Sequence, residues 1–94
     1  MKPFVASVVG GNLLVVRFEK FERSQIHPSH GLVELFNHVE ASKSNSFLEL
    51  EHHSPVKVLA PGESISAWQT WEVFPISPNA TMDYIRQQLK SSRF

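Results

Sequence analysis

The chain has 94 residues with nine basic and nine acidic side chains, so its formal net charge is zero when histidine is neutral. Neither sign is clustered, and the basic patch expected of a DNA- or RNA-binding protein is missing, so we expect no nucleic-acid partner. The absence of cysteine excludes disulfides and thiolate sites and favours a cytoplasmic protein over a secreted one. No run approaches the ~20 apolar residues of a membrane span, and the length suits one domain over residues 1–94.

The first two apolar segments, residues 4–9 and 13–18, are rich in Val and Phe and are joined by Gly10-Gly11-Asn12. Gly and Asn accept the positive φ of a tight turn, so this pattern predicts an antiparallel β-hairpin. Residues 22–31 have no periodicity and contain Pro28, which indicates a loop.

Two further strands are expected in the middle of the chain. Residues 32–40 carry apolar side chains on both faces, which predicts either a central strand between two layers or a sheet with a partner on its second face. After the polar turn at 41–46, Leu48 and Leu50 alternate with Glu49 and Glu51, which is the period of a half-buried strand. Glu49, Glu51 and His53 should therefore share one face.

The sequence Ala60-Pro61-Gly62-Glu63 suits a type II turn, and we expect it to close a second hairpin between residues 56–59 and 65–73. In the closing strand, Trp71 lies on the face predicted to be buried and Trp68 on the polar face. Ser77 as N-cap and Pro78 in the first turn then predict a C-terminal helix over about residues 78–90.

The predicted fold is mainly β: an antiparallel β-sandwich of about six strands with one C-terminal α-helix. Its expected core is drawn from the apolar face of each predicted strand. These residues are Val16, Phe18, Leu35, Leu48, Leu50, Leu59, Trp71 and Val73.

The candidate chemistry lies in the paired carboxylates. Glu49 and Glu51 stand roughly 7 Å apart along one strand face at ~3.4 Å per residue, where they can bind hydroxyl groups or supply a general base, or simply form a solvated face. Trp68 can stack on a sugar ring or pack in a subunit contact. Five histidines suggest a metal site, with His27 and His30 spaced for a loop clamp and His52 adjacent to His53. His52 and His53 point to opposite faces of a strand, however, so we expect neither a metal nor a cofactor.

The run from Leu48 to Glu51, the turn from Val58 to Glu63 and the final strand rich in Trp and Phe resemble the C-terminal end of the galactose mutarotase (aldose 1-epimerase) superfamily, including its uncharacterised bacterial branches. The resemblance implies a β-supersandwich that binds sugars, with Glu49 in the position of the catalytic base and Glu51 where those enzymes often have glutamine. It covers about 30 residues closely and 75 loosely. The chain is about a third of a full mutarotase domain, and no residue matches the family's catalytic and substrate-binding histidines.

Two functional hypotheses follow from these residues and from the resemblance. The first is a non-catalytic interaction or oligomerisation domain that forms a homodimer, with Phe36, Trp68 and Phe74 in the contact. The alternative is a carbohydrate-binding module, or a sugar epimerase completed by a second subunit, with Glu49 as the catalytic residue and Glu51, Trp68 and His53 binding the ligand.

Overall fold

The computed structural model describes residues 3–90 and confirms a mainly β protein with two antiparallel sheets and one C-terminal helix. Its backbone divides into two compact units, one containing residues up to Glu19 and from Trp68 onward, the other residues Lys20–Ala67. The described residues form five strands, one fewer than expected, because residues 56–59 form none. No helix among the described residues is long and apolar enough to cross a membrane.

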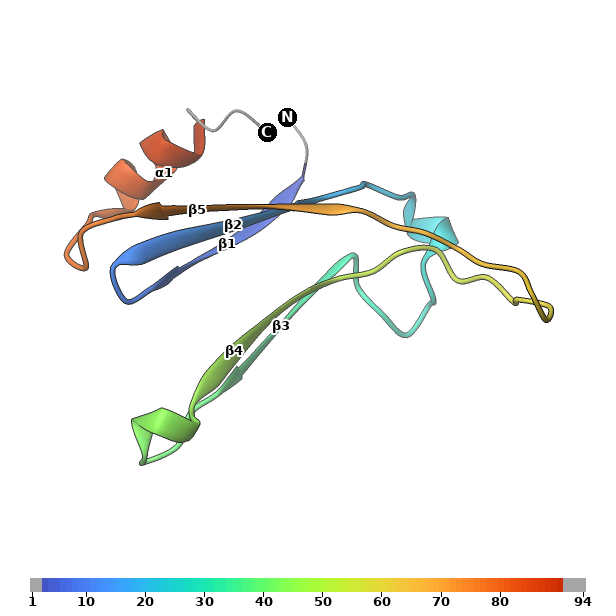
Figure 1. Cartoon of the computed structure of the whole chain (residues 1–94), viewed down its shortest axis with the longest axis horizontal. Coiled ribbons are helices and arrows are strands. Elements are labelled where there is room, and N and C mark those ends of the chain that lie inside the picture. The colour runs from blue at the N-terminus through green and yellow to red at the C-terminus, as the bar shows by residue number, and fades with distance from the viewer. Residues whose placement is uncertain (1–2, 91–94) are drawn as a thin grey trace. The chain divides into compact units, whose positions relative to one another are not determined.

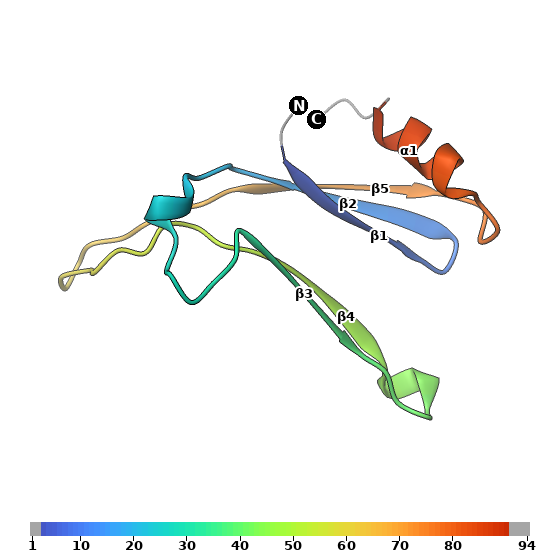
Figure 2. The ribbon, with the colours of Figure 1, turned by 180° about the vertical axis from the view of Figure 1, so that it is seen from behind.

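The first unit contains a three-stranded sheet in the order β1-β2-β5, built from β1 (Phe4–Val9), β2 (Asn12–Phe18) and β5 (Gln69–Pro75), as Figure 1 shows. The predicted β1–β2 hairpin is confirmed, with Gly10 at φ 59° in its turn. Helix α1 (Met82–Lys90) lies against one face of this sheet (Figure 2).

One hydrophobic cluster of the first unit lies beneath α1. Leu13, Val15 and Ile76 are buried there, and the partly buried apolar side chains around them include Ile85 and Leu89 from the helix. The helix begins four residues later than expected, because Ser77 accepts the Asn79 amide in a turn of its own. The N-cap is Thr81, whose hydroxyl accepts the Tyr84 amide.

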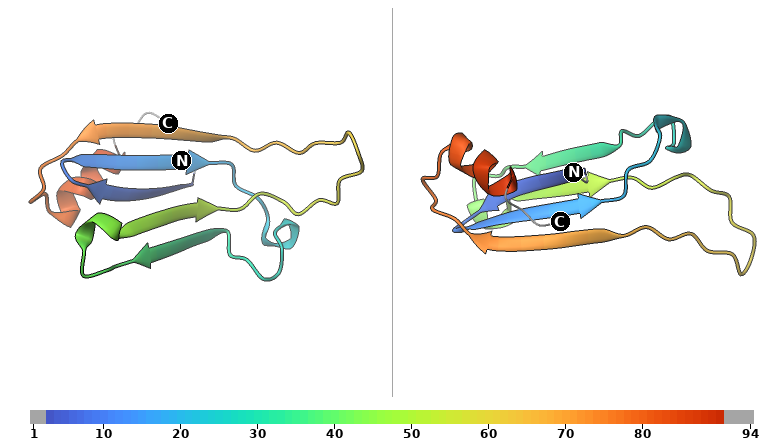
Figure 3. Two further views of the ribbon diagram at one scale, coloured as in Figure 1. Left: turned by 60° about the horizontal axis from the view of Figure 1, so that its bottom comes forward. Right: turned by 90° about the horizontal axis from the view of Figure 1, so that it is seen from above.

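The second unit contains the hairpin of β3 (Val33–His38) and β4 (Phe47–His52), which run side by side in Figure 3. The described residues add no third strand to this sheet, so β3 has a strand neighbour on one edge only. Two short 3₁₀ helices, η1 (Arg23–Gln25) and η2 (Lys43–Asn45), lie in the connections.

The predicted second hairpin is wrong, although its turn is right. Glu63 donates its amide to the Ala60 carbonyl at 3.0 Å and Gly62 has φ 87°, as a type II turn requires. The flanking residues 53–68 nevertheless form no strand. Pro55 and Pro61 cannot donate to a ladder, and β5 pairs with β2 instead.

The predicted core is right in part. Val16 and Phe18 are buried and Leu50 is half-buried, but the other five members are exposed: Leu35, Leu48, Leu59, Trp71 and Val73. In the first unit α1 covers the other face of the sheet, the one that carries Leu13 and Val15, and Trp71 is left 64% exposed on the opposite face. Strand alternation identifies two faces but does not say which one a helix will cover.

Candidate functional site

The chemistry-bearing side chains of the second unit gather on one face of the β3–β4 hairpin. Residues directly opposite in an antiparallel pair point to the same side, and the register pairs Glu34 with Glu51 and Phe36 with Glu49. We call these four residues and His53, which follows β4 in the same alternation, the carboxylate face. The opposite side, which we call the apolar face, carries Val33, Leu35, Leu48 and Leu50.

Glu49 and Glu51 interact on this face, as their spacing predicted. A hydrogen bond with the Glu51 carboxyl group raises the pKa of Glu49 above its ordinary value, and desolvation and charge repulsion from Glu51 act in the same direction. Two carboxyl groups can form such a bond only while they share a proton. The pair can therefore exchange a proton or bind hydroxyl groups, and both members are exposed to solvent.

His53 is also on this face, but its side chain contacts Glu34 and not the Glu49–Glu51 pair. The Glu34 Oε2 atom forms a short hydrogen bond with His53 Nε2 and lies 3.3 Å from His30 Nδ1. The His30 and His53 rings stack with centroids 4.5 Å apart. The bond with His53 is the main reason why the pKa of Glu34 lies below its ordinary value, with a smaller contribution from His30.

The loop that supplies His30 is held by Arg23. The Arg23 guanidinium donates to the backbone carbonyls of Ile26 and Pro28 at 3.3 and 3.2 Å, and the His30 amide closes a turn on the His27 carbonyl at 2.9 Å. The side chain of Ile26 is buried, which fixes the start of this loop. His30 is therefore placed by a braced turn although its own ring is exposed.

The far end of the hairpin carries three stacked or tilted rings. Phe47 lies 4.9 Å from His38 and 5.9 Å from Phe36, measured between ring centroids. His38 Nε2 also contacts Glu40 Oε1 at 2.8 Å. Phe36 is thus an exposed aromatic side chain directly opposite Glu49, a neighbour that the sequence pattern did not assign to it.

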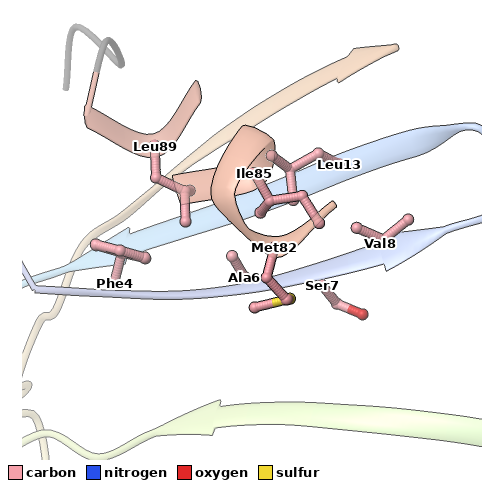
Figure 4. A pocket seen from close by; sticks show the side chains of 8 residues that line it. All are labelled: Phe4, Ala6, Ser7, Val8, Leu13, Met82, Ile85 and Leu89. Carbon is pink, nitrogen blue, oxygen red and sulfur yellow. The ribbon is translucent and has the colours of Figure 1, made fainter. Parts of the chain in front are cut away.

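Trp68 is not a cross-strand neighbour of the carboxylates. It precedes β5, which pairs with β2 in the first unit, and its side chain is 40% exposed. That unit also holds a groove of about 310 Å³ between α1 and the β1–β2 hairpin (Figure 4). Its walls are apolar side chains such as Phe4, Met82 and Leu89, and the eight lining residues include no titratable group.

Comparison with known protein families identifies the family of this chain. The family described as "Domain of unknown function (DUF4380)" matches residues 1–74. The chain belongs to this family. The matched region contains β1 to β4 and all of β5 except Pro75, and it stops before α1. No curated protein and no solved structure matches the chain.

Within this DUF4380 chain, the structure brings three of the four predicted site residues, Glu49, Glu51 and His53, to one face and leaves Trp68 in the other unit. Glu34 was not predicted from the sequence, and His30 was suggested only as part of a loop clamp with His27. The signal for Glu34 was available, because pairing Leu32 with His53 across the 41–46 turn puts Glu34 beside His53. No periodic signal identifies His30, since it lies in a loop.

Proposed function

We propose that this domain is a non-catalytic interaction module that self-associates, with a second copy covering the apolar face of the β3–β4 hairpin. The observation that carries the proposal is the exposure of large aliphatic side chains on a regular strand face, led by Leu35 at 63% and Leu48 at 45%. An isolated two-stranded hairpin is marginally stable in water, so this face requires cover.

A second copy is the occupant that the charge and topology favour. The chain has no net charge, so two copies do not repel one another at long range. The two-stranded sheet also leaves one edge of β3 and one edge of β4 without a strand partner among the described residues. A twofold axis brings the same apolar face of two copies together, as in most homodimers, and leaves such an edge free to pair with a strand.

The size of the contact sets the expected affinity. Each strand of the hairpin has six residues, which makes the apolar face small, and interfaces below about 1,200 Å² are weak or transient. Covering the exposed part of one Leu35 is worth about 1–2 kcal/mol, given about 1.5–3 kcal/mol for a whole aliphatic side chain. Because a symmetric dimer contains two such residues, losing both should weaken association roughly 30-fold or more.

Sedimentation velocity over a concentration series tests the proposal. We expect a reversible monomer–dimer equilibrium in the micromolar range and a monomer for Leu35→Asp. Val58→Asp is the matched control, because Val58 is more exposed than Leu35 but lies outside the strands. A wild-type chain that stays monomeric at several hundred micromolar, or a Leu35→Asp chain that dimerises normally, refutes the proposal.

A second candidate function is carbohydrate binding, and one observation favours it: exposed Phe36 stands directly opposite Glu49 on the face that also carries Glu51. An aromatic ring beside carboxylates offers stacking and hydrogen bonds to one sugar. It also fits the resemblance to galactose mutarotases, in which Glu49 takes the position of the base and a second subunit would complete the site.

NMR titration with a panel of monosaccharides tests this candidate. Glu49→Gln keeps the shape and removes the charge, and Glu72→Gln in the first unit serves as the control for losing one carboxylate. Shifts around Glu49 and Phe36 that disappear only in Glu49→Gln support sugar binding. An absence of shifts at tens of millimolar sugar excludes it.

A further inference from the structure

We propose that His30, Glu34 and His53 form a binding site for a divalent transition-metal ion such as Zn²⁺, and this inference does not rest on the observations that support self-association. His30 Nδ1, His53 Nε2 and one carboxylate oxygen of Glu34 all lie within 4.8 Å of one another. The three side chains come from separate segments: the loop after η1, strand β3 and the residue that follows β4.

One of the three ligand spacings already suits a tetrahedral ion. With metal–ligand bonds of about 2.0–2.1 Å, two ligands of a tetrahedral site stand roughly 3.3 Å apart. The distance from His30 Nδ1 to Glu34 Oε2 is 3.3 Å. Metal binding would replace the hydrogen bond between Glu34 and His53, and both side chains are partly exposed to solvent.

The charge of the surrounding face favours a cation. Glu34 is the direct cross-strand partner of Glu51, and like charges in that position destabilise a sheet. Glu49 adds a third carboxyl group on the same side, and its pKa is raised by the hydrogen bond with Glu51, by desolvation and, to a smaller extent, by charge repulsion from Glu51. An ion of charge +2 bound by Glu34 offsets this excess of negative charge.

Backbone hydrogen bonds also position the ligand residues in the metal-free protein. Arg23 braces the loop that carries His30 through backbone carbonyls. The His53 amide donates to the Leu32 carbonyl at 3.1 Å, which extends the ladder by one residue and fixes His53 two residues from Glu34 along the paired strand. Outer contacts of this kind orient ligands and raise affinity.

The donor set selects the kind of metal. Two imidazole nitrogens and one carboxylate oxygen suit zinc, copper, nickel or cobalt better than magnesium or calcium, which prefer oxygen ligands. Three protein ligands leave a fourth position for water or another donor. This combination takes His30 from the suggested His27–His30 clamp and His53 from the His52–His53 pair, and it adds Glu34, which the sequence did not suggest.

Isothermal titration of the untagged full chain with Zn²⁺ tests the site. We expect one ion per chain, no binding of Mg²⁺ under the same conditions, and a loss of affinity of more than ~10-fold in each of His30→Ala, Glu34→Gln and His53→Ala. His38→Ala and Glu40→Gln are matched controls, because His38 and Glu40 form a similar contact to which the described residues add no third ligand.

Two results overturn the proposal: no Zn²⁺ binding by the wild-type chain at hundreds of micromolar, or equal losses in the site and control variants. Circular dichroism of each metal-free variant separates loss of a ligand from loss of the fold. Should one site variant unfold, the two others still decide the question, since each removes a different ligand. A ratio of one ion per chain on both sides of any dimerisation midpoint keeps the result separate from self-association.

Discussion

Leu13→Ala should destabilise the protein far more than the same substitution at Leu35. Leu13 is 1% exposed and packs with Val15 and Ile76 beneath α1. Replacing a fully buried leucine by alanine lowers the free energy of unfolding by about 2–5 kcal/mol, depending on how far the neighbouring side chains fill the space left behind. The groove of about 310 Å³ that Leu13 lines already leaves room on one side. We therefore expect a loss near the lower end, about 2–3 kcal/mol.

Leu35 provides the comparison because the residue type and the substitution are identical. It is 63% exposed, so only about a third of the ~1.5–3 kcal/mol burial energy of an aliphatic side chain is at stake, roughly 0.5–1 kcal/mol. A domain of this size loses about 4–8 °C in melting temperature per kcal/mol. Leu13→Ala should therefore melt about 10–20 °C lower than the wild type, and Leu35→Ala only a few degrees lower.

Thermal unfolding followed by circular dichroism measures both variants. The protein concentration should be low enough for the chain to be monomeric, so that covering Leu35 in a dimer does not contribute. Equal shifts in melting temperature, or a larger shift for Leu35→Ala, would show that the apolar face is buried within the monomer and that the assignment of the core beneath α1 is wrong.

Three further outcomes are expected. The folded-state pKa of Glu49 is raised, so the charged form of Glu49 destabilises the folded protein at a pH above that pKa. Glu49→Gln should therefore increase the free energy of unfolding at neutral pH. Urea unfolding at a series of pH values should show this gain disappearing as the pH falls through the carboxyl range. Gly62→Ala should cost about 1–2 kcal/mol in thermal unfolding, because φ is 87° and the added Cβ meets no atom within 4 Å, so the cost is that of the backbone alone. Arg23→Ala should weaken Zn²⁺ binding about tenfold by calorimetry while all three ligands remain, because it releases the loop that places His30.

The parts of the fold that local sequence determines were predictable. The Gly10-Gly11 turn defines the β1–β2 hairpin, with Asn12 already in β2, and the Pro61-Gly62 turn forms as expected. Both depend on backbone conformations that few other residues adopt. The pairing of β5 with β2 was not predictable in this way, because the two strands are more than fifty residues apart and no turn joins them.

The faces of the sheet were harder to assign for a related reason. Leu13 and Val15 alternate with Leu14 and Val16, so both faces of β2 carry apolar residues and periodicity cannot rank them. The deciding fact is that α1 packs on the side of Leu13. Arg17, buried on that same side with its guanidinium 5.0 Å from the centre of the Phe4 ring, would have been assigned to the surface from its charge alone.

The candidate site likewise combines residues that local sequence could predict with residues that it could not. Period-two alternation was enough to put Glu49, Glu51 and His53 on one face, because they belong to a single run of extended chain. Glu34 comes to that face only through the register of β3 on β4, and His30 only through a loop conformation held by Arg23. A site assembled from three segments therefore remained invisible to spacing, although each of its residues is an ordinary metal ligand.

The two faces of the β3–β4 hairpin are linked through the pairing of its strands. A metal ion bound by His30, Glu34 and His53 holds the loop, β3 and the end of β4 together, whereas a second copy on the apolar face requires the same strands to be paired. A ligand that binds only the paired form stabilises it by RT ln(1 + [L]/Kd), about 2.7 kcal/mol at a hundredfold excess over Kd. Because one marginal element carries both sites, each ligand should strengthen the binding of the other by the same factor. The hairpin would then couple the two proposed interactions without any change of fold.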